Sequence, residues 1–219
     1  MIKVITERPV ATDSPDHQRP LGTAVDNTKN PLVNKNFLLL TKERPIKVMD
    51  LGCAGGGMVQ TLLADGFIAV GLEGSDYCLQ RKQYEWATVP DNLFTCDISA
   101  PFLVMENEQL MQFHIITAWD VMEHVFPERV DTVCENIAKH LLPGGHFICS
   151  IPINSPNFPR GSYGPGDYPW HQVHWEAENW EAKFAKYGLV PKVYEEWDPR
   201  GWLRGEDHES CYRKILQKI

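Results

Sequence analysis

The middle of the chain alternates between short apolar runs and segments that carry apolar residues on one face. The apolar runs predict buried strands, which we expect at 46–51, 67–74, 92–97, 113–119 and 146–152. Several segments between them predict helices, at 57–66, 77–86 and 127–142. Alternation of this kind indicates an α/β protein whose mainly parallel sheet is covered by helices on both faces. In such sheets, ligands bind at the carboxyl ends of the strands.

The first 45 residues do not follow this alternation. They are rich in polar and turn-forming side chains, so we separate an N-terminal leader, 1–45, from a main domain, 46–219. A short helix is expected within the leader at 32–40. Residues 11–31 fit two interpretations, a loosely ordered segment or a lid that folds over a site.

The carboxyl-terminal part adds an insertion and three further elements. The insertion, at about 153–175, is rich in aromatic and turn-forming residues. It is followed by an expected helix at 175–188 and by two expected strands, 189–197 and 211–219, which pair as a C-terminal β-hairpin. The three residues PGG, 143–145, predict a sharp turn into the strand at 146–152.

Composition and charge narrow the class of protein. The 219 residues fit one domain with embellishments, and 43% hydrophobic and 23% charged residues are ordinary for a folded protein with a core. The formal net charge of −8 and the scattered basic residues argue against nucleic acid as a partner. No run approaches the roughly 20 apolar residues that cross a bilayer, and the start lacks the apolar core of a secretory signal. Six cysteines without a C-x-x-C pair suit reduced thiols, so we expect a cytoplasmic protein.

The segment IKVMDLGCAGGGMVQTLLADG, 46–66, joins a strand to a helix through a glycine-rich turn. Gly52, Ala54 and Gly57 fit the G-x-A-x-x-G form of a nicotinamide-dinucleotide fingerprint, but a glycine pattern alone is weak support. Because a helix begins directly after the turn, we expect the loop to offer backbone N–H groups to a carboxylate.

Acidic residues at three successive strand ends identify the ligand better than the glycines do. Asp50 would repel a pyrophosphate and attract an ammonium group. Glu73 is placed to accept both hydroxyls of a ribose, and Asp97 to accept from an exocyclic adenine amine. Together they describe an adenosine that carries positive charge and no phosphate, which is S-adenosylmethionine.

Five ordered motifs resemble class I S-adenosylmethionine-dependent methyltransferases. VMDLGCAGGG resembles the first motif, with Ala54 in place of the usual middle glycine, while VGLEG and CDIS resemble the ribose and adenine motifs. FHIITAWDVMEHV resembles the fourth-strand segment of the small-molecule branch typified by ubiquinone-biosynthesis O-methyltransferases, with His114 replacing a common aspartate. LLPGGHFICSIP resembles the turn and fifth strand of that branch. More loosely, the leader is similar to those of bacterial methyltransferases associated with surface-polysaccharide clusters.

The resemblance implies a Rossmann-like, seven-stranded, mainly parallel sheet and S-adenosyl-L-methionine as the cofactor. The cofactor residues are expected in the loop and at the strand ends: Asp50, Gly52, Cys53, Ala54, Gly55, Gly56, Glu73, Gly74, Ser75, Asp97, Ile98, Trp119 and Asp120. Trp119 either stacks near the adenine or sulfonium or packs in the core.

Three histidines are candidates for the acceptor side of the site. His124 follows the fourth strand, where it either takes a proton from an acceptor hydroxyl or holds a backbone carbonyl. His171 and His174 lie in the aromatic-rich insertion and are expected to contact the acceptor. We expect no metal site, and a set made of Asp167, His171 and His174 is the disfavoured alternative.

The function expected from these features is methyl transfer to a hydroxyl of a small-molecule acceptor, with a sugar or glycan precursor favoured. The alternatives are a small-molecule N-methyltransferase, a NAD-dependent oxidoreductase and a non-catalytic subunit that keeps the cofactor fold. The sequence does not give the oligomeric state.

Overall fold

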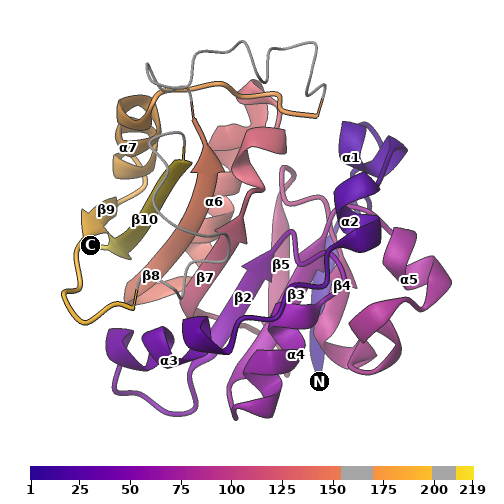
Figure 1. Cartoon of the computed structure of the whole chain (residues 1–219), viewed down its shortest axis with the longest axis horizontal. Coiled ribbons are helices and arrows are strands. Elements are labelled where there is room, and N and C mark those ends of the chain that lie inside the picture. Colours follow the sequence, from indigo (N-terminus) through magenta and orange to yellow (C-terminus); the bar gives the residue numbers. More distant parts are fainter. Residues whose placement is uncertain (154–169, 199–210) are drawn as a thin grey trace.

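The computed structural model describes residues 1–153, 170–198 and 211–219. A seven-stranded sheet in the order β4-β3-β2-β7-β8-β10-β9 forms its centre (Figure 1). The strands are β2 (Lys47–Leu51), β3 (Ile68–Glu73), β4 (Leu93–Thr95), β7 (Phe113–Trp119), β8 (Leu141–Pro152), β9 (Leu189–Lys192) and β10 (Cys211–Lys218). The first five are parallel, and β10 runs antiparallel to β8 on one side and β9 on the other. The predicted fold class and the C-terminal hairpin are confirmed.

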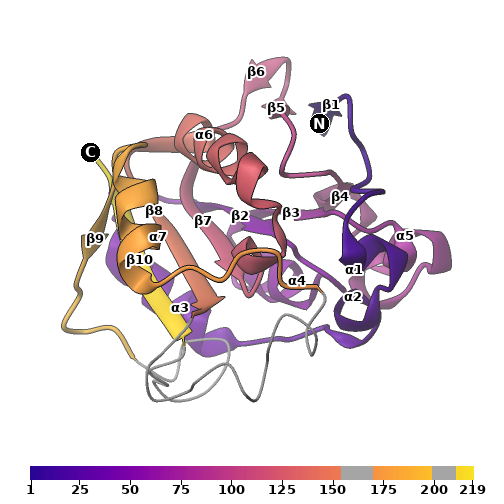
Figure 2. The same ribbon diagram turned by 90° about the horizontal axis from the view of Figure 1, so that it is seen from above.

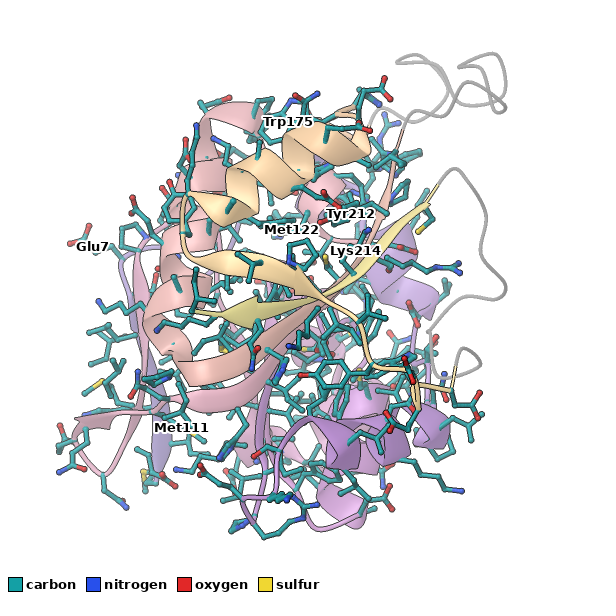
Figure 3. All side chains as sticks on the ribbon, turned by 90° about the vertical axis from the view of Figure 1, so that its left-hand side faces the viewer. Glu7, Met111, Met122, Trp175, Tyr212 and Lys214 are labelled. Atoms are coloured by element: carbon teal, nitrogen blue, oxygen red, sulfur yellow. The ribbon has the colours of Figure 1, made fainter. Side chains whose placement is uncertain are left out.

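Different helices cover the two faces of the sheet (Figure 2). The helices are α1 (Pro15–Gln18), α2 (Leu21–Val25), α3 (Pro31–Leu40), α4 (Gly57–Ala64), α5 (Tyr77–Arg81), α6 (Val130–His140) and α7 (Ala177–Ala185). Side chains alternate across a strand, so Met49 of β2 packs with α6 and α7 while Val48 packs with α3 and α4. Met122 and Tyr212 lie under α7 in the first of these cores, and Trp175 packs against its edge (Figure 3).

The described residues include four short 3₁₀ helices: η1 (Tyr84–Ala87), η2 (Pro90–Asn92), η3 (Met122–His124) and η4 (Pro127–Arg129). Of these, η1 and η4 replace parts of two predicted helices. The helix expected at 77–86 stops at Arg81 because Lys82 and Tyr84 have positive φ angles, of 48° and 52°, which an α-helix does not accept. The helix expected at 127–142 is α6 preceded by η4.

The turn predicted at PGG is absent as a separate turn. Residues 143–145 belong to β8, which already pairs with β7 at Leu141 and pairs again at His146 after a register shift. Gly144 takes a positive φ of 74° inside this irregularity. The glycine-rich turn signal therefore marks a bulge within a longer strand.

A second sheet was missed by the sequence analysis. It is antiparallel, in the order β1-β5-β6, and consists of β1 (Ile2–Thr6), β5 (Phe102–Glu106) and β6 (Gln109–Leu110). The start of the leader is therefore an ordered strand. From its end the chain crosses the carboxyl ends of β3 and β2, where α1 and α2 lie (Figure 1). In the part of the chain described here, no helix has the length and apolar character to cross a membrane.

Candidate active site

The three acids predicted at strand ends all lie at the carboxyl edge of the sheet. Asp50 is in β2, Glu73 ends β3, and Asp97 follows β4. Parallel pairing brings these strand ends to one edge, and all three side chains are buried. Three buried acids at one edge favour a ligand that offers positive charge or several hydrogen-bond donors.

Asp50 has the environment expected for an ammonium site. Its Oδ1 accepts a hydrogen bond of 2.6 Å from the Thr117 hydroxyl. Complete burial nevertheless raises the pKa of the Asp50 carboxyl to about 7, because the charged form is removed from water. A cation beside this carboxyl would offset that cost, so Asp50 fits the amino group of S-adenosylmethionine.

Glu73 already accepts three donors. The backbone N–H groups of Ala54 and Ser75 lie 2.8 and 2.9 Å from its oxygens, and the Thr23 hydroxyl lies at 3.4 Å. Burial raises the pKa of Glu73, and these donors oppose the shift. A carboxylate has about four acceptor positions, so one is left. The structure therefore supports one further bond from a ribose hydroxyl more readily than the two expected.

Asp97 is held in a similar way. Its Oδ1 accepts from the backbone N–H and the hydroxyl of Ser99, at 2.9 and 2.6 Å, and Arg8 of the leader forms an ion pair with Oδ2 at 2.8 Å. The neighbouring Ile98 is buried, and its carbonyl accepts from Asn136 at 3.1 Å. An adenine amine would have to share Asp97 with Arg8.

The glycine loop uses its N–H groups internally. Those of Gly52 and Cys53 donate to the Leu72 carbonyl, and those of residues 54–56 donate to Glu73, to the Asp26 carbonyl and to the Cys53 carbonyl. The N–H groups of the loop itself already have acceptors, so they are not the ones that a carboxylate would find open. Residues 57–59, in the first turn of α4, are those whose N–H groups have no acceptor within the helix.

The loop backbone is shaped by unusual φ angles. Gly52 and Gly56 have φ angles of 69° and 86°, and a Cβ on Gly52 would lie 2.4 Å from the Val121 side chain. Ala54 also has a positive φ, of 45°, in the place where related motifs carry glycine. The Cys53 side chain packs against Gly71 of β3, so it faces the sheet.

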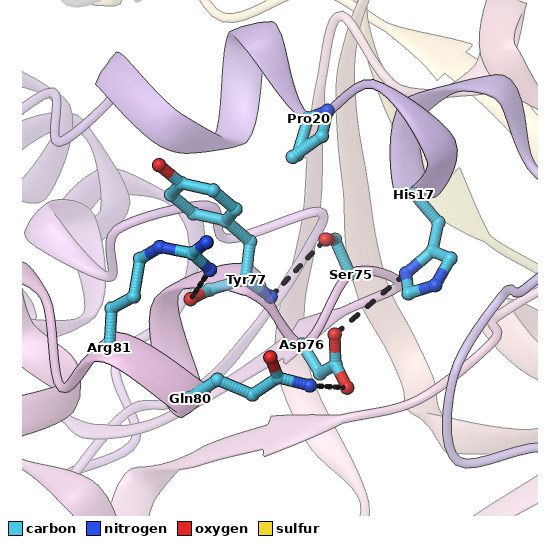
Figure 4. Close-up of a pocket in the computed structure, with 7 residues that line it drawn as sticks. All are labelled: His17, Pro20, Ser75, Asp76, Tyr77, Gln80 and Arg81. Carbon is cyan, nitrogen blue, oxygen red and sulfur yellow. Dashed lines mark hydrogen bonds and ion pairs between the residues drawn. The ribbon is translucent and has the colours of Figure 1, made fainter.

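A polar cavity of about 390 Å³ adjoins this edge on the side of α5 (Figure 4). Its walls include His17, Ser75, Asp76, Tyr77, Gln80 and Arg81. The Arg81 guanidinium lies 3.7 Å from the centre of the Tyr77 ring. The volume is within the range of small-molecule sites, but the lining is more polar than is usual for them. The Gly74 carbonyl beside this cavity accepts from the Ala11 N–H of the leader at 2.8 Å.

The structure brings the three candidate histidines into one cluster beyond β7. The rings of His124 and His171 are 4.9 Å apart, edge to face, and those of His171 and His174 are 6.3 Å apart. Nδ1 of His124 lies 2.7 Å from Asp16, and Nε2 lies 3.6 Å from Glu123. Asp16 and Glu123 were not among the predicted site residues. Glu123 lies in the segment FHIITAWDVMEHV, which resembles the fourth-strand segment of related methyltransferases, but no local signal marks Asp16.

Burial and nearby charges shift the pKa values of Glu123, His124 and His171 in different directions. Burial raises the pKa of Glu123 to about 8, and neither of its carboxyl oxygens has a hydrogen-bond partner among the residues that the structure describes. Burial opposes the charged form of His124, but the contact with Asp16 and the field of Glu123 outweigh it and raise the pKa to about 8. Burial and the nearby His124 lower the pKa of His171 to about 4.

One set of ligating atoms in this cluster is compact enough for a cation. One atom each from Glu123, His124 and His171 lies within 4.8 Å of the others. No metal site was expected from the sequence. The disfavoured alternative combined His171 with His174 and Asp167, and Asp167 lies outside the described residues. The spacing along the chain could not show that His171 folds back onto His124.

Three other residues near β7 have clear structural contacts. The Trp119 indole N–H donates to Met58 Sδ at 3.0 Å, and the ring packs against the core beside α4. Asp120 has a φ of 51°, and its Oδ1 accepts from the Ser150 hydroxyl at 2.7 Å. His114 lies at the start of β7, far from this edge, where Nδ1 accepts from the Lys47 N–H at 2.9 Å.

Comparison with known proteins agrees with the fold. A family model described as "Methyltransferase domain" matches residues 27–196, and the chain belongs to that family. It has the fold of class I S-adenosylmethionine-dependent methyltransferases. This assignment disfavours the nicotinamide-dependent alternative.

Individual relatives share only a low sequence identity with this chain. The ubiquinone biosynthesis O-methyltransferase of Acinetobacter baylyi is 28% identical over 113 residues, which cover 50% of this chain and 45% of that protein. The chain thus matches somewhat under half the length of this curated relative. A TehB-like S-adenosylmethionine-dependent methyltransferase from Corynebacterium glutamicum has a TM-score of 0.60 at 15% identity, covering 95% of this chain and 98% of its own. An amino pentose methyltransferase from Micromonospora echinaspora, solved with S-adenosylmethionine, has a TM-score of 0.60 at 16% identity, covering 85% and 89%.

Proposed function

We propose that this chain transfers the methyl group of S-adenosylmethionine to a hydroxyl of a small molecule, with a sugar or glycan precursor as the acceptor. The observation that carries the proposal is the histidine cluster beyond β7, next to the acidic edge that fits the cofactor. A poorly acidic hydroxyl must lose its proton as it attacks, and a nearby imidazole can take it. The curated relative is an O-methyltransferase, and a structural neighbour acts on an amino pentose.

We assign the cofactor to the acidic edge by the chemistry of its residues. Asp50 receives the ammonium group, Glu73 one ribose hydroxyl, and the N–H groups at the start of α4 the carboxylate. Asp97, Ile98, Gly74 and Ser75 border the adenosine. When bound, S-adenosylmethionine supplies a methyl group on a positively charged sulfur, which is electrophilic without further activation.

The protein itself positions the acceptor against the methyl donor and supplies a base. Holding acceptor and donor in line can supply several kcal/mol of the rate enhancement. His124 takes the proton of the acceptor hydroxyl, and His171 contacts the acceptor in its neutral form, since its pKa is about 4.

The leader is proposed to act as the lid. Arg8 contacts Asp97, Ala11 and Thr23 contact the Gly74 carbonyl and Glu73, and the Asp26 carbonyl accepts from Gly55. Each contact falls on a residue assigned to the cofactor. We therefore expect the leader to move when the cofactor enters and to close over it afterwards.

An acceptor screen tests the proposed reaction. The purified chain is incubated with radiolabelled S-adenosylmethionine and with panels of free sugars, sugar nucleotides, phenols and amines. We expect label in hydroxyl acceptors, with sugars or sugar nucleotides foremost. Label confined to amines would replace the proposal with the N-methyltransferase alternative.

A further inference from the structure

The carboxyl of Glu123 is enclosed on all sides and receives no hydrogen bond from its surroundings. Its side chain is 0% exposed, and among the residues that the structure describes neither Oε1 nor Oε2 has a hydrogen-bond partner. Buried polar atoms in folded proteins nearly always have a partner, and buried charges are paired or coordinate a metal ion. Two open oxygens on one buried side chain therefore point to a small cation as the missing partner.

The fold brings two imidazoles to this carboxyl. His124 follows Glu123 in η3, and its Nε2 lies 3.6 Å from Glu123 Oε1. The Glu123 carbonyl accepts from the N–H groups of Gln172 and Val173, at 2.7 and 3.1 Å. These two backbone bonds attach the chain after His171 to η3, and the His171 ring lies 4.9 Å from that of His124. The three side chains are therefore held together by backbone contacts as well as by packing.

The spacing of the ligand atoms suits one ion. One atom each from Glu123, His124 and His171 lies within 4.8 Å of the others. The ligands of a tetrahedral ion with bonds of about 2.0–2.1 Å lie roughly 3.4 Å from one another. The separation of 3.6 Å between Glu123 and His124 is already close to that value. A rotation of the His171 side chain would bring the third ligand into range.

The donor atoms select the kind of ion. Mg²⁺ and Ca²⁺ prefer sites made of oxygen ligands, whereas imidazole nitrogens suit Zn²⁺ and related transition metals. One carboxylate and two imidazoles, with a fourth position left open, is a ligand set that Zn²⁺ accepts. Asp120 is not one of these ligands, and its Oδ1 accepts from the Ser150 hydroxyl at 2.7 Å.

We propose that Glu123, His124 and His171 bind one Zn²⁺ ion, and that this ion and the base role of His124 exclude each other. A metal ion takes the lone pair with which a neutral imidazole accepts a proton. The zinc-loaded chain therefore keeps the acidic strand ends and loses the base. Only the second clause rests on the proposed function, because binding of the ion depends on the three side chains alone.

The first test is binding, and it needs no methyl acceptor. The full chain is freed of metal with EDTA, exchanged into metal-free buffer, and titrated with Zn²⁺ in a calorimeter and with Co²⁺ as a spectroscopic substitute. We expect one ion per chain, visible Co²⁺ absorption of a four-coordinate site, and much weaker binding of Mg²⁺. No saturable binding of Zn²⁺, or binding of Mg²⁺ as tight as that of Zn²⁺, overturns the proposal.

Variants locate the ion. Loss of an outer-shell partner commonly costs 10- to 100-fold in metal affinity, so loss of a direct ligand in Glu123→Gln or His171→Gln should weaken Zn²⁺ binding at least about tenfold. His174→Gln is the matched control, because its ring lies 6.3 Å from that of His171 but outside the ligand set, and it should bind as the unmodified chain does. His171 is only half-buried, so His171→Gln decides the matter if Glu123→Gln does not fold. Unchanged affinity in His171→Gln overturns the proposal.

The second test reads turnover on the best hydroxyl acceptor from the screen, which is itself run in EDTA. Saturating Zn²⁺ should lower kcat by roughly 10²–10⁴-fold, the contribution of a general base, and leave the Kd for S-adenosylhomocysteine within twofold. Excess EDTA should restore the rate, and His171→Gln should need at least about tenfold more Zn²⁺ for the same inhibition. A rate that is unchanged or raised at saturating Zn²⁺ overturns the exclusion.

The outcomes separate this inference from the proposed function. If the chain binds Zn²⁺ through these residues but methylates no hydroxyl acceptor in EDTA, the proposed function fails and the exclusion falls with it, while the metal site stands. If the chain methylates a hydroxyl acceptor and does not bind Zn²⁺, only this inference fails.

Discussion

Two histidines only 4.9 Å apart have pKa values displaced in opposite directions. His171 is half-buried without a compensating anion as strong as that of its neighbour, so its pKa falls to about 4. His124 contacts Asp16 and lies near Glu123, so its pKa rises to about 8. At neutral pH the first ring is uncharged and the second is largely protonated.

This difference predicts a pH profile. The base must be neutral to take a proton, so kcat/KM should rise with pH and level off above about 8, following His124. His124→Gln should lower turnover by roughly 10²–10⁴-fold and leave S-adenosylhomocysteine binding nearly unchanged. Steady-state rates between pH 6 and 9.5 check both, with His140→Gln as a variant remote from the site for comparison. A profile without a rise near pH 8, or full turnover in His124→Gln, contradicts the assignment.

Asp50 predicts a proton linked to cofactor binding. Its pKa of about 7 means that the carboxyl is largely protonated below that pH in the free protein. An ammonium group favours the ionised form, so binding should release a proton, and affinity for S-adenosylhomocysteine should rise by up to about tenfold per pH unit from pH 5.5 to 7. Calorimetry at pH 6 in two buffers with different ionisation enthalpies measures the release. Asp50→Asn should abolish it, and identical heats in both buffers for the unmodified protein would refute this role.

The raised pKa of Asp50 also makes the stability of the fold depend on pH. The folded pKa of Asp50 lies above its unfolded value of 3.8, so the unfolded chain loses its proton first as the pH rises. The contribution of Asp50 to the free energy of unfolding therefore falls between about pH 4 and 7. A bound cation removes that loss.

Among the structural elements, the glycine loop carries a measurable strain. Ala54 has a φ of 45°, a region that costs an L-residue with a Cβ about 1 kcal/mol. Ala54→Gly should therefore raise the free energy of unfolding by about 1 kcal/mol. Ala138→Gly, within α6, is the control of opposite sign, because glycine in a helix interior costs about 1 kcal/mol. Urea unfolding of both variants measures the two changes in the free energy of unfolding. A loss of stability in Ala54→Gly would show that the loop is not strained there.

The leader is the element whose mobility should depend on the cofactor. Its backbone is attached to the site by the Ala11 N–H on Gly74 and by the Asp26 carbonyl on Gly55. We expect S-adenosylhomocysteine to slow hydrogen exchange at Ala11 and Gly55, and Arg8→Gln, which removes the ion pair with Asp97, to speed it. Lys3→Gln, which loses an exposed ion pair with Glu108, is the matched control. Exchange that is indifferent to the ligand would argue against a lid.

The features that the sequence predicts correctly are those set by residues close together in the chain. The apolar run at 113–119 and the glycine after α4 are local signals, and the strand and the helix end that they predict are confirmed. The pairing of Ile2–Thr6 with Phe102–Glu106 joins segments far apart in the chain, and neither strand has a turn signal that points to the other. The same is true of Asp16 and His171, which reach His124 only through tertiary folding.

At the scale of the whole molecule, the sheet, the leader and the histidine cluster form one continuous edge. The acids of β2 and β3 and the one that follows β4 lie at the part of this edge proposed to hold the cofactor, and the histidine cluster after β7 lies at the part proposed to receive the acceptor. The leader crosses between them, attached by Arg8 to Asp97 and by Asp16 to His124. One segment therefore contacts both the acidic strand ends and the histidine cluster.

Isothermal titration of the purified chain with S-adenosylhomocysteine and, separately, with NAD tests the central claim most directly. The acidic strand ends should hold one molecule of S-adenosylhomocysteine per chain and should reject the pyrophosphate of NAD. Glu73→Ala should weaken binding at least tenfold, since it removes both a ribose acceptor and the anchor of the Ala54 N–H. Saturable binding of NAD, or no heat with S-adenosylhomocysteine, would contradict the account.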